Sequence, residues 1–358
     1  MRTFVYKFLN SLLICCFIMY SVAAQSNFKN NFSFSAYGDI YYSYDFNNPS
    51  NHEKPNFIYN HKRHNEINAN LLLIRANYQD EGLRANIGLM AGNYAQYNLM
   101  SEPSWAQNVY EANIGIKLSK KSNLWLDAGI LPSHIGFESA ISSDCWTLTR
   151  SMVAENSPYY ETGLKLGYSN KSEKLNVALY VLNGWQKISK PNFTQTPSFG
   201  LQVNYTINSN LLFNYSNFVG TDKPDSMMAL RTYHNVYFQY HKGKTIGIVA
   251  GFDIGTDKYH ATKYGVWYSP IVVLQYTLNK KSKLALRGEY YHDQNEIIIS
   301  TPSKLGFQVL GLSSNFDYAI YKNVQWRFEG KLFKAQQALF NNGRKLNFSL
   351  TTNLSIKI

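Results

Sequence analysis

The C-terminal stretch LNFSLTTNLSIKI, residues 346–358, decides the fold. Its apolar residues recur at every second position, and most of the positions between them are polar. An amphipathic helix would repeat its apolar residues at intervals of three and four, whereas alternation is typical of a β-strand with one apolar face. The apolar positions are Leu346, Phe348, Leu350, Leu354, Ile356 and Ile358, and the polar ones are Asn347, Ser349, Asn353, Ser355 and Lys357.

The same alternation recurs along the whole chain and predicts about sixteen strands. The first of them, from Phe32 to Phe46, places Ser33, Ser35, Asp39, Ser43 and Asp45 on its polar face. The stretch 65–78 changes phase around residues 71–73, which suggests a β-bulge. The other predicted strands lie near 83–94, 108–118, 124–131, 161–169, 175–183, 199–207, 211–219, 232–241, 245–255, 266–278, 283–291, 305–317, 323–333 and 346–358.

The links between these strands alternate in length, and this alternation predicts a membrane barrel. After every even-numbered strand the link is short and polar: QDEG, SKKSN, NKSEK, NSN, HKGK, NKKS and AIYK. After odd-numbered strands the links are long, as at 47–64, 95–107, 132–160, 184–198 and 220–231. Antiparallel transmembrane barrels have short periplasmic turns and long extracellular loops. We therefore predict one all-β, antiparallel barrel of about 16 strands over residues 25–358, with both termini in the periplasm.

The N-terminal segment 1–24 has the features of a secretory signal peptide. Arg2 and Lys7 precede an apolar run, and Val22-Ala23-Ala24 supplies small residues for cleavage. Its removal would lower the formal charge from +12 to +10 and leave Cys145 as the remaining cysteine. An exported chain rarely meets nucleic acid, so we expect no nucleic-acid partner. Much of the positive charge lies instead at the short turns, on Lys120, Lys121, Lys171, Lys174, Lys242, Lys244, Lys280, Lys281, Lys283 and Lys322.

The phase of each strand predicts which side chains face lipid and which face the lumen. In the stretch 323–333, Val324, Trp326, Phe328 and Leu332 would face lipid, and Gln325, Arg327, Glu329 and Lys331 would face the lumen. A lysine or arginine facing lipid near the bilayer centre costs about 2–4 kcal/mol, so charges belong on the inner face. Aromatic residues near strand ends are expected to form the interfacial girdles: Tyr41, Tyr42, Trp125, Trp267, Tyr290 and Tyr291.

Ten charged side chains are the candidates for the pore wall. Six are acidic and four are basic, so the wall by itself indicates no ion preference. They are Asp39, Glu111, Lys117, Asp127, Glu161, Lys165, Arg287, Glu289, Arg327 and Glu329.

The link 132–160 is the longest stretch without alternation. Loops of this length are usually functional or disordered, and this one carries many apolar residues, among them Ile135, Trp146 and Met152. We expect it to fold into the lumen, as the third loop of general porins does; a loop packed over the barrel mouth is the alternative. Folded inward, it would present as constriction residues His134, Glu138, Asp144, Arg150 and Glu155.

Catalytic and metal-binding patterns are weak in this sequence. His61 and His64, in HKRH, have a spacing that could chelate a metal, but two histidines of a polar loop are more often solvated. Ser133, His134 and Glu138 are neighbours in one loop, which does not by itself make a triad. We therefore predict no enzymatic activity, no metal and no cofactor.

Several short sequence motifs resemble those of a known protein family. They include DIYYSYDFNNP (39–49), YEANIG (110–115), SHIGFES (133–139), LTRS (148–151), AENSPYYE (154–161), GFDIG (251–255) and RGEYYHD (287–293). These motifs are similar to those of the OmpL-like β-barrel porins of the porin-2 type, which are common in the outer membranes of Bacteroidota. The resemblance covers nearly the whole mature chain and implies an outer-membrane porin without catalytic residues. Ile358 departs from the aromatic residue that commonly ends outer-membrane barrels.

These observations predict passive diffusion of small hydrophilic solutes or ions through a water-filled barrel. The expected partners are outer-membrane lipid, the solutes themselves and, in a homotrimer, further copies of the chain. A closed barrel that serves as an adhesin or as a platform for a partner protein is the alternative. Such a barrel would need long ordered loops and a plugged lumen.

Overall fold

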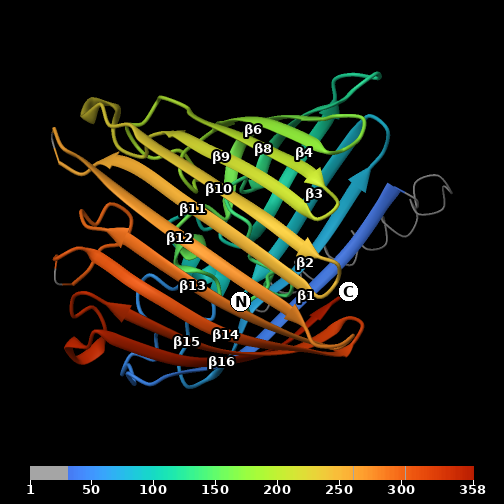
Figure 1. The fold of residues 1–358 in the computed structure, drawn as a ribbon. Helices are drawn as coiled ribbons and strands as arrows, with labels where there is room; N and C mark the ends of the chain where they lie inside the picture. The colour runs from blue at the N-terminus through green and yellow to red at the C-terminus, as the bar shows by residue number, and fades with distance from the viewer. Residues whose placement is uncertain (1–30, 261, 303) are drawn as a thin grey trace, which may run out of the picture.

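The computed structural model describes residues 31–260, 262–302 and 304–358. The predicted signal peptide at 1–24 lies outside the described residues. Sixteen strands form one closed antiparallel barrel, in which each strand pairs with its sequence neighbours and β1 closes on β16. Figure 1 shows this closure, with the blue first strand beside the red last strand. The predicted fold class and strand number are confirmed.

The described strands agree closely with the alternating stretches of the sequence. Links at one end of the barrel are all short and most of those at the other end are long, and we call these the short-turn end and the long-loop end. The strands are β1 Phe32–Asp45, β2 Ile67–Gln79, β3 Leu83–Ala91, β4 Val109–Lys117, β5 Asn123–Pro132, β6 Tyr160–Ser169, β7 Leu175–Leu182, β8 Ser198–Asn208, β9 Leu211–Gly220, β10 Arg231–Lys242, β11 Ile246–Lys258, β12 Tyr264–Thr277, β13 Ser282–Asp293, β14 Phe307–Tyr321, β15 Val324–Ala335 and β16 Leu346–Lys357.

Within the described residues, helices are few and short, and they lie in the long links. Two are α-helical, α2 (Asn93–Asn98) and α3 (Met152–Glu155), and three are 3₁₀ turns, at Ser142–Asp144, Asp225–Met227 and Asn341–Gly343. None of the described helices is long and apolar enough to span a bilayer. The predicted strand 83–94 ends early, at Ala91. Gly92 has φ +111°, a conformation that favours glycine, and the chain turns there into α2.

The irregularity expected in the stretch 65–78 is a bulge at Asn70. Asp39 pairs with Leu71 while Ile40 pairs with Ala69, so Asn70 is the extra residue of β2. The bulge buries the Asn70 side chain, whose Oδ1 accepts a hydrogen bond from the His61 backbone N–H at 2.7 Å. A bulge that re-aims one side chain in this way is common at barrel rims and functional sites.

The apolar residues of the barrel divide into an outer band and an inner core. Leucines such as Leu286, Leu312 and Leu354 are about half exposed on the outer face, where lipid covers them. Inside, apolar residues of the 132–160 segment pack against lumen-facing aromatic residues of the wall, as Ile135 and Met152 do in the cluster that contains Phe218. The packed core therefore lies within the barrel.

Four of the six aromatic residues expected in the girdles face the lumen instead. Tyr41, Trp267 and Tyr291 are each 1% exposed and Trp125 is 6% exposed, whereas Tyr42 is 37% exposed on the outer face. Tyr290 follows Tyr42 in lying on the outward phase of its strand. Loops inside this barrel give inward aromatic rings apolar partners, so an aromatic residue near a strand end does not have to face lipid.

Candidate solute pathway

The segment 132–160 lies against lumen-facing side chains of the wall formed by β13 to β16. Arg327 of β15 binds both the segment and the wall. Its Nη1 donates to the Ser142 carbonyl at 2.6 Å and its Nη2 to the Cys145 carbonyl at 3.0 Å, while Asp317 accepts two further bonds. Arg327 is 0% exposed, so this contact excludes water.

A second arginine, Arg287 of β13, binds the C-terminal half of the segment, and we call the contacts of Arg327 and Arg287 with the segment the two clasps. Arg287 Nη1 donates to the Thr149 carbonyl at 2.7 Å and its Nη2 to Glu329 Oε1 at 2.9 Å. Glu329 accepts the backbone N–H of Thr149, and Glu289 accepts that of Met152. Buried charges are tolerated when they are paired and hydrogen-bonded. Four of the ten wall candidates, Arg287, Glu289, Arg327 and Glu329, thus bind the segment and are buried beneath it.

Two of the loop candidates stabilise the segment internally. Arg150 is 0% exposed and donates to the carbonyls of Leu148 and Ala140, so its charge does not border open space. This differs from the expectation that Arg150 faces the channel. Several acceptors converge here because the segment turns back on itself and leaves its carbonyls unpaired. Glu138 accepts the backbone N–H of Ser151 and lies 3.6 Å from Arg287.

His134 anchors the root of the segment. Its Nδ1 lies 2.7 Å from Glu161 Oε2 and its Nε2 lies 2.7 Å from the Asn217 carbonyl, and its ring stacks on Tyr180 at 4.2 Å. Both ring nitrogens face acceptors, which a neutral imidazole could satisfy only once. Burial opposes the charge, but the Glu161 carboxylate outweighs it and raises the pKa of His134. His134 and Glu161 are thus a buried pair and do not line open water.

The first long link, 47–64, also enters the barrel mouth. His61 and His64 are 0% and 1% exposed, so the expectation that they are solvated is wrong. His61 Nε2 lies 2.9 Å from Asp39 on β1, whereas His64 Nδ1 accepts the backbone N–H of Asp45. The two histidines thus have different partners. Within the described residues, no group of three or more His, Cys, Asp and Glu could hold a metal ion.

Glu155 connects the two inward links. Its carboxylate accepts the backbone N–H groups of Tyr59 and Asn60, and burial raises its pKa. It borders a vestibule of about 380 Å³ at the long-loop end, where Tyr97, Trp185 and Arg231 also lie. Asp144 lies toward the opposite end of the barrel, where it pairs with Lys357 at 2.6 Å beside a cavity of about 670 Å³ at the short-turn mouth.

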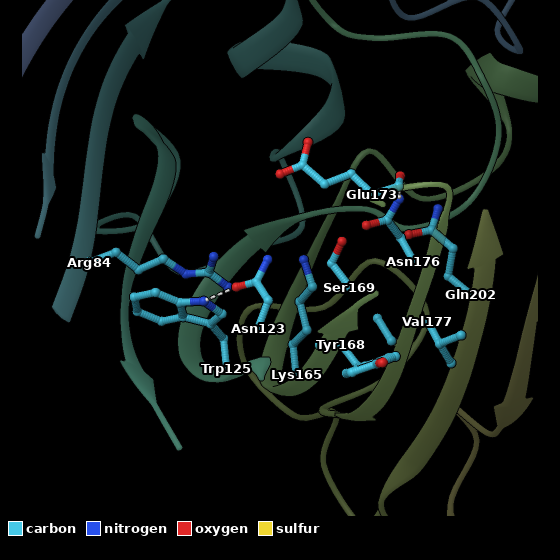
Figure 2. Close-up of a pocket in the computed structure, with 12 residues that line it drawn as sticks. Arg84, Asn123, Trp125, Lys165, Tyr168, Ser169, Glu173, Asn176, Val177 and Gln202 are labelled. Carbon is cyan, nitrogen blue, oxygen red and sulfur yellow. Dashed lines mark hydrogen bonds between the residues drawn. The ribbon is translucent and has the colours of Figure 1, made fainter. Parts of the chain in front are cut away.

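The remaining wall candidates lie on β4 to β6, away from the clasps. Glu111 pairs with Arg75 at 2.6 Å, and Asp127 pairs with Arg84 at 2.5 Å. Lys117 is exposed at the short-turn end of β4. Lys165 borders a chamber of about 410 Å³ together with Arg84 and Trp125, as Figure 2 shows.

A much smaller cavity, of about 10 Å³, lies between the segment and the wall at β10 and β11. That volume holds about one water molecule. Glu138, Ser157 and Tyr159 border it from the segment, and Asn235 and Asp253 border it from the wall. Ser157 also borders the vestibule, so the two spaces adjoin.

Comparison with known proteins assigns the family. The model of the family described as "Putative beta-barrel porin-2, OmpL-like" matches residues 31–357. The chain belongs to this family. The family and the closed sixteen-stranded barrel make it an outer-membrane porin, and the predicted family and location are confirmed. No curated protein matches the chain in sequence.

Solved porin structures share this fold at low sequence identity. An anion-selective porin from Comamonas acidovorans is 10% identical with a TM-score of 0.63, and the match covers 91% of this chain and 99% of that one. The outer-membrane channel DcaP of Acinetobacter baumannii is 9% identical with a TM-score of 0.61, over 91% and 97%. The trimer form of OmpT from Vibrio cholerae is 11% identical with a TM-score of 0.57, over 91% and 99%.

Several residues of the porin pathway were missed by the sequence reasoning. Arg75, Arg84, Asn235 and Asp253 stand on the lumen-facing phase of their strands, which is the signal that could have found them. Their importance comes from the open spaces that they border or from the acidic residues that they pair with, and those depend on where the loops fold.

Proposed function

We propose that this porin passes small hydrophilic solutes or ions by passive diffusion, and that the segment 132–160 sets the narrowest point of its channel. The position of the segment carries this proposal. It is bound to lumen-facing residues of β13 to β15, and spaces open toward both ends of the barrel lie around it. A sixteen-stranded barrel would otherwise leave a wide aqueous channel.

The proposed constriction lies between the segment and the wall at β10 and β11. Asn235 and Asp253 are register partners there, and Glu138 faces the same small cavity. A constriction selects solutes by its diameter and its fixed charges. We therefore assign the selective step to this gap, which has to widen beyond the one water molecule that it holds in this structure before a sugar can pass. We assign to Lys117 and Lys165 the role of charged groups in the wider space below it.

Three further assignments complete the proposal. Residues 1–24 act as the export signal, the short-turn end faces the periplasm, and the native assembly is a homotrimer. The even strand number supports the second, because it places both termini at the end with the short turns. The trimer form of the Vibrio cholerae OmpT, which shares this fold, supports the third.

Solute entry into liposomes tests the proposal. Proteoliposomes that contain the folded, heat-modifiable barrel should swell in isotonic arabinose, more slowly in a disaccharide and least in raffinose, because the constriction admits small solutes first. Empty liposomes are the control. Swelling no faster than that of empty liposomes with every solute would contradict the porin proposal.

The filled lumen favours a second candidate function. Two long links enter the barrel, and the cavity between the 132–160 segment and β10 is about the size of one water molecule. A closed barrel of this kind would suit an adhesin or a platform for a partner protein. The same swelling experiment separates the candidates, because a closed barrel passes none of the sugars.

A further inference from the structure

Four register partners form one transverse row beside the chamber at the short-turn end, and two of them, Arg84 and Lys165, line the chamber. Register pairing places Arg84 of β3 beside Gly115 of β4, Gly115 beside Asp127 of β5, and Asp127 beside Lys165 of β6. All four face the lumen at one level of the wall. Arg84 and Lys165 therefore flank Asp127, with glycine in the remaining position.

The two cations keep donors that no described residue uses. Arg84 binds Asp127 through Nε and Nη2, at 2.6 and 2.5 Å, and its Nη1 makes no hydrogen bond within the described residues. The Lys165 ammonium makes neither a hydrogen bond nor an ion pair with any described residue; the ring of Tyr180 lies 5.9 Å away. By contrast, Arg287 and Arg327 on the opposite wall are paired with carboxylates and hydrogen-bonded to the inward segment.

Small residues keep the space in front of Lys165 open. Gly167 and Ala178 are register partners on β6 and β7, and both line the chamber. A Cβ atom at Gly167 would meet only the Cε of Lys165, at 3.6 Å, so nothing else fills that position. Larger side chains here would occupy the chamber, whose volume is about 410 Å³.

The rest of the lining donates hydrogen bonds or carries few competing charges. The amides of Asn123, Asn176 and Gln202 border the chamber, and Figure 2 shows Lys165 pointing into the same space beside Arg84 and Trp125. Arg84 stacks over Trp125 at 4.4 Å, which holds its guanidinium in place. Glu173, in the exposed short turn, is the one lining carboxylate.

We propose that this chamber is a binding site for a small oxyanion, a carboxylate or a phosphate, on its way through the porin. Arg84 Nη1 and Lys165 Nζ would bind the anionic oxygens, because charge-assisted bonds from guanidinium and ammonium groups suit carboxylate and phosphate. The amides of Asn123 and Asn176 would bind the rest of the solute, whereas the Gln202 Nε2 already donates to the His134 carbonyl and to Asn214 Oδ1. The proposal rests on the proposed diffusion function and adds to it a class of solute.

Block of chloride current by the anion tests this site. Full-length protein in planar bilayers carries KCl current, and sodium succinate or sodium phosphate is then titrated in. For the wild type we expect saturable block by at least one of the two, and which of them blocks identifies the preferred oxyanion. Lys165→Gln should weaken the block about tenfold or more, the usual effect of losing a charged hydrogen bond. Lys165→Arg should restore most of it.

Two further variants separate the site from a general loss of positive charge. Lys283→Gln removes a lumen-facing lysine at the short-turn mouth of the opposite wall and should leave the block unchanged. Gly167→Leu fills the chamber without changing its charge and should abolish the block. Equal block in wild type, Lys165→Gln and Gly167→Leu, or no block by either anion in a conducting wild type, would overturn the site. A folded wild type without any KCl current would overturn the diffusion function instead.

Discussion

Deletion of residues 138–155 is expected to raise the single-channel conductance several-fold. The deleted stretch contains Glu138 and most of the contacts that fasten the segment to Arg287 and Arg327. Its root remains, because His134 keeps its bonds to Glu161 and to the Asn217 carbonyl. Without the stretch, the clasp residues would face water in a lumen wide enough for an aqueous channel. Planar-bilayer recordings of both proteins in the same salt measure the change.

A control deletion in another long link makes this result specific. Residues 190–196 belong to the long link between β7 and β8, and Phe193 there is 81% exposed. Their removal should change the conductance little. Equal conductance of the wild type and the 138–155 deletion, with both barrels folded and heat-modifiable, would show that the segment does not limit the current.

Arg327→Met is expected to release the tip of the segment, residues 142–145, from the wall and to expose Cys145. The substitution removes the donors to the Ser142 and Cys145 carbonyls and leaves Asp317 without its cation. Breaking a buried pair in this way costs about 3–5 kcal/mol where water cannot enter. In the wild type Cys145 is 8% exposed, and burial raises the pKa of its thiol. A reagent therefore reaches the sulfur rarely, and little of the thiol is in the reactive thiolate form. The variant should react with a water-soluble maleimide many times faster.

Arg84→Met is the matched control for this labelling. Arg84 also holds an aspartate through two bonds, but it lies on β3, and its hydrogen bonds and ring contact within the described residues go to Asp127 and Trp125 of β5. Both variants are made in a Cys15→Ser, Cys16→Ser background, so that Cys145 is the single thiol. Slow labelling in both variants, with the barrel folded, would mean that Arg327 does not hold the tip.

The barrel could be predicted from the sequence because its cause is local. Alternation in residues such as Phe328, Glu329 and Leu332 follows directly from lipid on one side and polar groups on the other. The lengths of the links then give the topology, and closure follows because an unpaired edge strand is not tolerated in a bilayer. The third strand is an exception, because it ends before its predicted last residue. Gly92 there adopts a positive φ, and the chain leaves the strand.

The candidate site was predicted less well because it depends on contacts between distant segments. The alternation along each strand placed Asp39 and Glu329 on the lumen side. It could not show that His61 and Thr149 cover these carboxylates. Their places near strand ends suggested girdle positions for Trp125 and Trp267, but these residues contact Arg84 and Tyr233 inside the barrel. The open chamber at Lys165 depends on small residues of a neighbouring strand, which no linear pattern records.

Single-channel recording of the unaltered protein tests the central claim most directly. The folded barrel in a planar bilayer should produce discrete, stepwise increases of current in KCl, because water and ions cross it through a constriction beside the inward segment. A folded, heat-modifiable barrel that inserts into the bilayer and gives no current steps would contradict the porin account.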